Sequence, residues 1–294
     1  MIVLAPLRGV TTRLFRAVFA EEIAEAGFTE AVTPFISAMP GIDPLADDEL
    51  CGFGSGPFFG PGGGIKLTPQ FIGKDPSCLR SCLAKIKDAG YDTADLNCGC
   101  PFPMVRKKGR GSGILKTPDV LRKMLEAGCE AMGPGKFSAK VRIGLEDPGE
   151  LYGLMPVFNE FPLRFLAVHA RTARQMYVGE CDWKAVEAVE SVAKMPILRN
   201  GDILLPRPGE RRDAMIGRPF IRDLGARRDS AALLMRYVEA LKGEFFGDRP
   251  VLGRVKELVS YWGSSPEWDR AWKVVKMCSS IAELSSLSVF SRQL

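Results

Sequence analysis

The chain has 294 residues, of which 46% are hydrophobic and 26% are charged, and this balance excludes a chain that is disordered over most of its length. The formal net charge of +5 permits an anionic partner without requiring one. No apolar run approaches the roughly 18 residues of a membrane helix, and no basic segment precedes the short apolar run at the N-terminus, so we expect neither a membrane span nor a signal peptide.

Short apolar runs of strand type alternate with helical stretches along the first 217 residues. The predicted strands are residues 2–5, 31–36, 66–73, 93–97, 137–143, 165–170, 195–200 and 213–217. Amphipathic helices are predicted between several of them, at residues 12–27, 76–90, 117–132 and 182–194. This repeated alternation favours a parallel sheet closed into a (β/α)8 TIM barrel, with a doubly wound open sheet as the alternative.

From about residue 225 onward the pattern is helical only, with predicted helices at 229–245, 250–263, 266–277 and 280–293. Short connections between such helices are typical of a compact bundle. We therefore predict two domains, a catalytic barrel over residues 1–220 and a small all-α domain over residues 225–294.

Two segments fit the barrel pattern poorly. Residues 51–64 are rich in glycine, but no strand leads into them and no helix follows, so a mobile surface loop is favoured over a phosphate-binding loop. Residues 203–213 are short for a crossover between parallel strands, which normally takes about a dozen residues or more and includes a helix. Either the barrel lacks its seventh helix or the sequence lacks residues there.

The stretch 93-TADLNCGCPFP-103 places Cys98 and Cys100 on either side of one glycine, directly after a predicted strand. Such spacing could serve a metal, a disulfide, a nucleophile or an acid. A zinc site would need further ligands, but no pair of cysteines has C-x-x-C spacing and His169 is the only histidine, so we expect no metal. Scattered cysteines without an export signal indicate free thiols in a reducing cytoplasm.

Polar, glycine or charged residues stand at nearly every predicted strand end, which is where TIM barrels carry their active sites. Lys140 and Arg142 alternate along one strand and so face the same side, where they either pair with Asp95 or Asp202 or bind an anion or an electron-rich ring. Glycines at the ends of the last two strands stand where barrels usually bind phosphate.

Several motifs occur in order over residues 2–218: an AP-L-R-G-V-T start, QFIG, DLNCGCP, KKGRGSGIL, KVR, VHART, RNGDI and MIGR. Together they resemble the dihydrouridine synthase family, flavin-dependent enzymes that reduce uridines in tRNA. The LNCGCP form and the later RVKELVSYWG segment most resemble the C-type bacterial subgroup. The chain departs from the family pattern at Ala170, where the family usually has glycine in VHART.

The resemblance implies a bound FMN reduced by NADPH, a tRNA substrate and a C-terminal helical domain that helps to hold the tRNA. Cys100 would be the catalytic acid, with Asn97 placing the target uracil and Arg142 and Arg171 also binding substrate. The ring of the flavin would lie along two residues, its polar edge would bind three, and its ribityl phosphate would bind five: Pro6 and Leu7; Gln70, Lys140 and His169; Asn200, Gly201, Asp202, Gly217 and Arg218.

The implied reaction transfers a hydride from the flavin to C6 of uracil and a proton from Cys100 to C5. A thiol with an ordinary pKa near 8.5 is mostly protonated at neutral pH, as a proton donor requires. The basic run at residues 106–110 supports an RNA substrate, and we expect a cytoplasmic monomer. The alternatives are an FMN-dependent barrel oxidoreductase acting on a free small molecule, such as a pyrimidine, and an RNA-binding module that has lost catalysis.

Overall fold

A computed structural model of the chain describes residues 1–51, 56, 58–59, 64–206, 210, 213–263 and 266–287, without the side chains of residues 266 and 267. Within these ranges, no helix combines the length and the apolar character that crossing a membrane would take.

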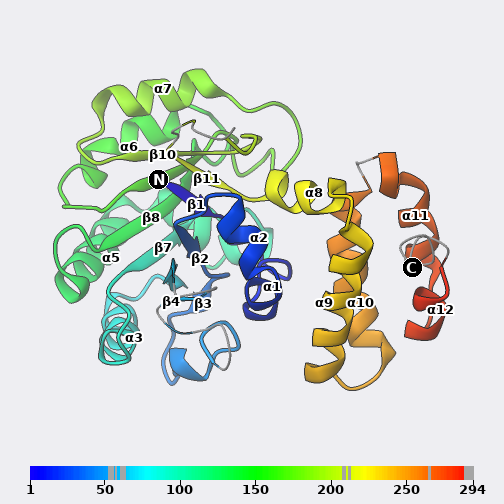
Figure 1. Cartoon of the computed structure of the whole chain (residues 1–294). Helices are drawn as coiled ribbons and strands as arrows, with labels where there is room; N and C mark the ends of the chain where they lie inside the picture. Colours follow the sequence, from blue (N-terminus) through cyan, green and yellow to red (C-terminus); the bar gives the residue numbers. More distant parts are fainter. Residues whose placement is uncertain are drawn as a thin grey trace.

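Parallel strands form a closed barrel surrounded by helices (Figure 1). In chain order the described strands are β1 (Ile2–Leu4), β2 (Glu30–Val32), β3 (Ile36–Ser37), β4 (Phe58–Phe59), β5 (Ile65–Thr68), β6 (Gln70–Ile72), β7 (Ala94–Cys98), β8 (Phe137–Arg142), β9 (Leu166–His169), β10 (Ile197–Asn200) and β11 (Ala214–Ile216). The first strand pairs in parallel with both β2 and β11, and the pairs β2–β5, β6–β7, β7–β8, β8–β9, β9–β10 and β10–β11 complete the ring. The predicted TIM barrel is confirmed, and the open-sheet alternative is wrong.

Two of the predicted strands are each split into two pieces. Pro69 separates β5 from β6, because proline has no N–H to donate to a neighbouring strand. The wall stays continuous through Thr33, whose backbone N donates to Thr68 O at 3.0 Å and whose Oγ1 accepts from Gln70 N at 3.0 Å. β2 and β3 therefore together make one strand of the barrel wall, as do β5 and β6. β4 pairs with β5 in the antiparallel direction.

Helices cover the outside of the barrel. They are α1 (Arg13–Val18), α2 (Ala20–Glu25), α3 (Pro76–Asp88), α4 (Pro103–Arg106), α5 (Pro118–Met132), α6 (Glu150–Phe158) and α7 (Trp183–Val192), with 3₁₀ turns η1 (Pro44–Ala46) and η3 (Gly111–Lys116). The single helix predicted over residues 12–27 is interrupted at Phe19. The sequence prediction missed α6, which contains Pro156.

The two segments that fitted the pattern poorly are partly described. Between Asn200 and Ala214, the described residues 201–206, 210 and 213 contain no helix. β10 and β11 nevertheless pair directly in parallel, with Asn200 opposite Met215, so the sheet is continuous at this point. Within 51–64, residues 51, 56, 58–59 and 64 are described and include β4; the predicted mobile loop otherwise lies outside the described residues.

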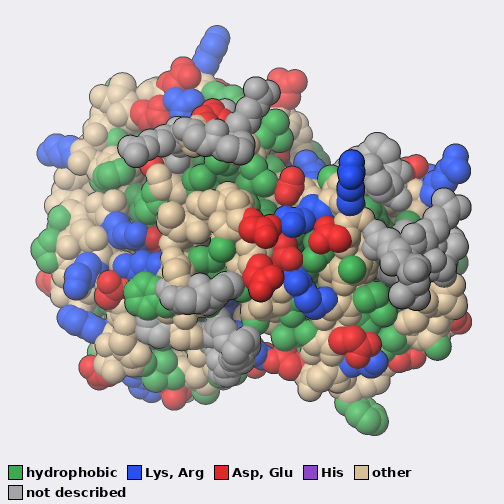
Figure 2. Space-filling view, in the orientation of Figure 1, with side chains coloured by type: hydrophobic (Ala, Val, Ile, Leu, Met, Phe, Trp, Pro, Cys, Tyr) green, Lys and Arg blue, Asp and Glu red, His purple; other side chains and the backbone are tan. Residues whose placement is uncertain are grey.

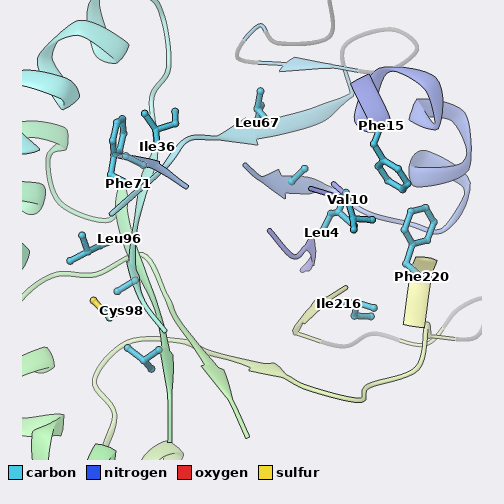
Figure 3. Packing of buried hydrophobic residues seen from close by; sticks show 14 of the residues in the cluster. Leu4, Val10, Phe15, Ile36, Leu67, Phe71, Leu96, Cys98, Ile216 and Phe220 are labelled. Atoms are coloured by element: carbon cyan, nitrogen blue, oxygen red, sulfur yellow. The ribbon is translucent and has the colours of Figure 1, made fainter. Parts of the chain in front are cut away.

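Side chains alternate between the inside of the barrel and the helical layer, as strand geometry requires. One part of the interior is apolar and includes Val3, Val32, Phe165, Ala167, Leu198 and Met215. Buried polar residues on the strands include Glu30, Thr68, Asp95 and Ser138. Leu4, Phe71, Leu96 and Cys98 belong to the large apolar cluster that joins strands to helices (Figure 3).

The C-terminal helices α8 (Arg218–Ala226), α9 (Ser230–Glu244), α10 (Asp248–Trp262), α11 (Pro266–Met277) and α12 (Ile281–Ser285) stand beside the barrel (Figure 1). The predicted helical character of this region is confirmed, although α8 runs across the predicted boundary at 220–225 and residues 288–294 lie outside the described ranges. Phe15 and Phe19 pack on Tyr237 at the junction. Figure 2 shows acidic and basic side chains gathered along this seam, where the ion pairs are Arg13–Glu244, Arg227–Glu25 and Arg236–Glu22.

Candidate active site

A pocket opens at the carboxyl ends of the barrel strands and encloses about 760 Å³, its open mouth included. Most of the residues predicted for the site line it: Pro6, Leu7, Gln70, Asn97, Cys100, Lys140, Arg142, His169, Asn200, Gly201, Gly217 and Arg218. Asp202 and Arg171 are not among the lining residues.

The two thiols of the LNCGCP motif have different surroundings. Along β7, Asp95 and Asn97 face the barrel interior, so Cys98 points outward and is fully buried in the apolar cluster (Figure 3). Cys100 lies just past the strand and lines the pocket. Burial raises the pKa of the Cys100 thiol in spite of the nearby charges of Arg142 and other cations. The pocket-facing sulfur is therefore a protonated thiol at neutral pH.

The loop that carries Cys100 is held from two directions. Asn97 Oδ1 accepts hydrogen bonds from the backbone N of Gly99 at 3.2 Å and of Cys100 at 2.9 Å. On the other side, Cys100 O accepts from Ser112 N at 3.1 Å and from Ser112 Oγ at 2.9 Å. Gly111 has φ +55°, and a Cβ there would stand 2.7 Å from Cys100 Cβ. The KKGRGSGIL motif therefore packs directly beneath the cysteine loop.

Arg142 ties this loop to the segment after β9. Its Nε donates to Gly99 O at 2.9 Å, and its Nη1 donates to Thr172 O at 3.0 Å and Met176 O at 2.6 Å. The guanidinium also lies 5.2 Å from the ring centroid of Tyr177, a residue that the sequence prediction missed. Among the described residues Arg142 has no ion pair with Asp95 or Asp202, so the alternative of such a pair is wrong for this residue.

The rest of the pocket wall is strongly cationic. Lys140 Nζ donates to Asn200 Oδ1 at 2.8 Å, and the side chain of Asn200 is in turn held by Met215 O at 2.7 Å. Burial, with the nearby charge of Arg142, lowers the pKa of Lys140 to about 7. Burial and the same cations lower the pKa of His169 well below its usual value, so its imidazole is neutral. An anion or an electron-rich ring would relieve this concentration of positive charge.

Asp202 is exposed and lies between two arginines. It forms an ion pair with Arg171 and accepts from Arg218 Nη2 at 2.6 Å. Burial works against the charge of Asp202, but the two arginines outweigh it and lower the pKa of this carboxyl. Arg171 is 2% exposed and also donates to Gly179 O at 3.0 and 2.7 Å. Its side chain is thus committed to the protein, whereas Arg218 reaches the pocket.

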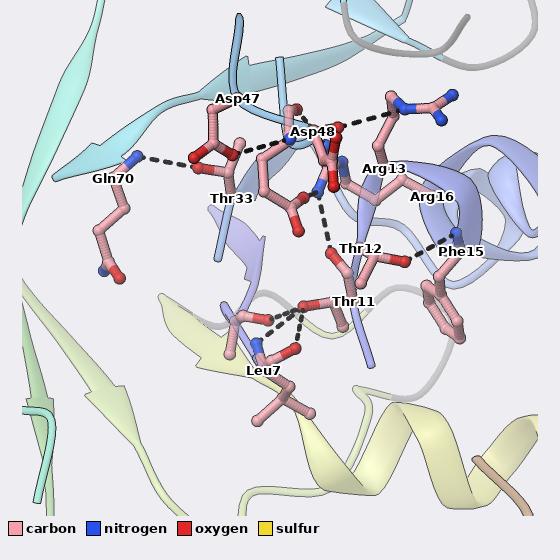
Figure 4. Close-up of polar contacts among 12 residues, drawn as sticks. Leu7, Thr11, Thr12, Arg13, Phe15, Arg16, Thr33, Asp47, Asp48 and Gln70 are labelled. Carbon is pink, nitrogen blue, oxygen red and sulfur yellow. Dashed lines mark hydrogen bonds and ion pairs between the residues drawn. The ribbon is translucent and has the colours of Figure 1, made fainter. Parts of the chain in front are cut away.

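Leu7 is held by hydrogen bonds within the loop between β1 and α1 (Figure 4). Leu7 N donates to Thr11 Oγ1 at 2.8 Å, and this hydroxyl lies 3.2 Å from Ala5 O. Arg16, which is fully buried, donates to Thr11 O at 2.9 Å and to Glu49 at 2.8 Å. Local pattern did not identify this support, although of these contacts only the one between Arg16 and Glu49 joins residues far apart in the sequence.

The model of the family described as dihydrouridine synthase (Dus) matches residues 3–217, well over half of the chain. The chain belongs to the dihydrouridine synthase family. The family recognised from the motifs is thereby confirmed, and the pocket is the candidate active site of this dihydrouridine synthase family member.

Curated relatives agree with this placement, and a solved structure shares the fold. A tRNA-dihydrouridine synthase B of Vibrio cholerae is 30% identical over 226 residues, covering 74% of this chain and 67% of the relative. A tRNA-dihydrouridine(16) synthase of Pseudomonas putida is 29% identical over 208 residues, covering 69% and 62%. An old yellow enzyme homologue from Zymomonas mobilis aligns with a TM-score of 0.53 at 12% identity over 75% of this chain and 85% of its own, a likeness of fold alone.

Proposed function

We propose that this family member reduces specific uridines of tRNA to 5,6-dihydrouridine, with FMN held in the pocket and NADPH as the reductant. The observation that carries the proposal is the Cys100 thiol, which lines a cation-walled pocket at the barrel mouth. The names of the relatives support tRNA as the substrate.

The pocket walls fit a flat, electron-rich cofactor with a phosphate tail. A Cβ at Gly201 would stand 2.6 Å from Cys181 Sγ, so this wall position disfavours a larger side chain, and a Cβ at Gly217 would stand 3.1 Å from Ala5 Cβ, so the wall is tight there. Lys140 supplies an N–H donor and positive charge for the polar edge of the ring. The side chain of Arg218 and its backbone N–H at the start of α8 suit the phosphate. A flavin bound here would supply the hydride that adds to C6 of uracil.

Cys100 supplies the proton in this proposal. Its raised pKa keeps the thiol protonated until the target uracil enters the pocket, and transfer of that proton to C5 of uracil completes the saturation of the C5–C6 bond. The charges of Arg142, Arg8 and Lys140 favour the thiolate that is left behind. Solvent then returns a proton to the sulfur before the next turnover.

The mouth of the pocket suits a base drawn out of a folded RNA. Phe35 and Phe102 line it, and Phe102 is 45% exposed, so aromatic faces are available for stacking. The basic run that follows at residues 106–110 would contact phosphates. We propose that the helices over residues 225–294 hold the remainder of the tRNA. Sequence analysis predicted that Arg171 contacts substrate. Because Arg171 is buried, we propose instead that it orients Asp202.

The proposal is tested with the purified protein, NADPH and unmodified tRNA, with dihydrouridine measured by mass spectrometry of digested RNA. Cys100→Ala is expected to lower uridine reduction by about 10²–10⁴-fold, the usual contribution of a general acid, while the flavin is still reduced by NADPH. Cys98→Ala is the matched control and is expected to retain activity. Equal rates of uridine reduction in the Cys100→Ala variant and the parent would refute the role of Cys100 as the acid. Reduction of free uridine without reduction of uridines in tRNA would favour the small-molecule alternative.

A further inference from the structure

A line of buried side-chain hydrogen bonds runs along the barrel interior toward the cysteine loop. Asp95 Oδ2 accepts from Gln70 Nε2 at 2.7 Å, and Gln70 Oε1 accepts from Asn97 Nδ2 at 2.8 Å. Asn97 Oδ1 then accepts from the backbone N of Gly99 and of Cys100. Neither Asp95 nor Gln70 has any exposed surface. The line thus connects a carboxylate deep in the barrel with the backbone that positions the acid.

The order of donors and acceptors in this line is fixed at both ends. At one end, backbone N–H groups can only donate, so the oxygen of the Asn97 amide must face the loop. At the other end, an ionised Asp95 can only accept, so the NH₂ group of Gln70 must face it. The oxygen of Gln70 is then left for Asn97, whose NH₂ group faces it. Every member has its partner in this one arrangement, and an amide flip at either position would oppose like groups.

We propose that Asp95 is a positioning residue that acts through Gln70 and Asn97 to hold the Cys100 loop in its working conformation. The proposal rests on the proposed function in one respect, namely that Cys100 is the acid. Asp95 itself does not line the pocket. Its second oxygen, Oδ1, accepts from Ser138 Oγ at 2.6 Å, so the carboxylate is anchored on two neighbouring strands. Gln70 lines the pocket as well, so the same carboxylate also orients an amide that faces the cofactor space.

The chemistry of the line predicts a distinctive pair of substitutions. In Asp95→Asn, the new oxygen can still face Gln70 while its NH₂ group faces Ser138 Oγ, so the order of the line survives. In Asn97→Asp, the Gln70 amide stands between two carboxylates and satisfies one of them at the expense of the other. In the double variant D95N/N97D the whole line reverses. The amide introduced at position 95 donates to Gln70 Oε1, and Gln70 Nε2 donates to the carboxylate introduced at position 97, which still accepts from the loop.

The test is hydrogen exchange of the backbone N–H groups of Gly99 and Cys100, followed by mass spectrometry of peptides that span the loop. Exchange is expected to be at least about tenfold faster than in the parent in Asp95→Ala and in N97D, close to the parent in D95N, and slowed again in the double variant. A peptide over β9 is the control for loss of the fold, because a local effect leaves its exchange unchanged. A restored double variant is an outcome that simple loss of packing does not produce.

Two results would overturn the proposal: unchanged loop exchange in Asp95→Ala, or an N97D defect that D95N does not reverse. If hydrogen exchange is also faster in the β9 peptide of Asp95→Ala, that variant has lost part of its fold. The proposal is then decided by N97D and the double variant, in which the side chains at positions 95 and 97 keep nearly their original volumes. Uridine reduction by Asp95→Ala is expected to fall about tenfold or more as well. If the parent makes no dihydrouridine in tRNA, the proposed function fails while the exchange comparison still decides the role of Asp95.

Discussion

Replacing Asp95 with asparagine is expected to make folding stability less sensitive to pH. Burial raises the pKa of Asp95 from 3.8 to about 6, although hydrogen bonds from Ser138 and Gln70 oppose the rise. The folded-state pKa therefore lies above the unfolded value. The stability tied to protonated Asp95 is fully present below pH 3.8 and is lost as the pH rises toward 6.

The size of the effect follows from the two pKa values. Between pH 4.5 and pH 7, ionisation of Asp95 is expected to remove about 2 kcal/mol from the free energy of unfolding of the parent. The Asp95→Asn variant lacks this contribution, so its stability relative to the parent should rise by about 2 kcal/mol over that interval. Urea unfolding of both proteins at the two pH values measures this difference, and other titrating groups cancel because both proteins share them. An equal stability gap at pH 4.5 and pH 7 would refute a raised pKa for Asp95.

Three further predictions concern the pocket. Gly111→Ala should abolish most uridine reduction, because the added Cβ would displace Cys100. Gly135 also has a positive φ but has nothing within 4 Å of an added Cβ, so Gly135→Ala should cost about 1 kcal/mol of stability and little activity. Equal activity in the two variants would contradict this. Arg142→Lys should lower uridine reduction at least about tenfold, since lysine cannot span three carbonyls, with flavin absorbance retained; loss of the flavin instead would mean that Arg142 mainly holds the cofactor. Filter binding of tRNA should weaken steeply between 50 and 200 mM salt, roughly in proportion to the number of phosphates contacted, and salt-independent binding would exclude the proposed basic contacts.

Local sequence pattern predicted the positions that the barrel brings together, but not all of their contacts. Strand ends such as Gln70, Lys140 and His169 could be placed at one mouth because parallel strands in a closed barrel end on the same side. The ring of Tyr177 over Arg142 could not be placed, since this contact depends on how distant segments pack. The hydrogen bonds among Leu7, Thr11 and Arg16 join residues close in the sequence, but they depend on the conformation of the loop that carries them. Arg171 shows the same limit: its position after a strand end was clear, but its burial was not.

The helix α6, which the sequence prediction missed, and the division of β5 from β6 each involve a single proline. α6 contains Pro156, which lowers any prediction of helix, and its surroundings stabilise it nonetheless. Pro69 interrupts a strand of the barrel wall without opening the wall, because a side-chain hydroxyl of Thr33 takes over part of the hydrogen bonding. In both cases tertiary contacts outweigh the backbone preference of one proline.

The pairing of β1 with β11 closes the barrel, so the barrel depends on its last strand. Ile2 pairs with Ala214 and Leu4 with Ile216, so more than two hundred residues must be synthesised before the cylinder can close. Until then β1 and β10 each expose a row of unpaired backbone groups, which other chains can bind. A nascent or truncated chain that stops before Ala214 should therefore be prone to aggregate, however well its earlier strands and helices have formed.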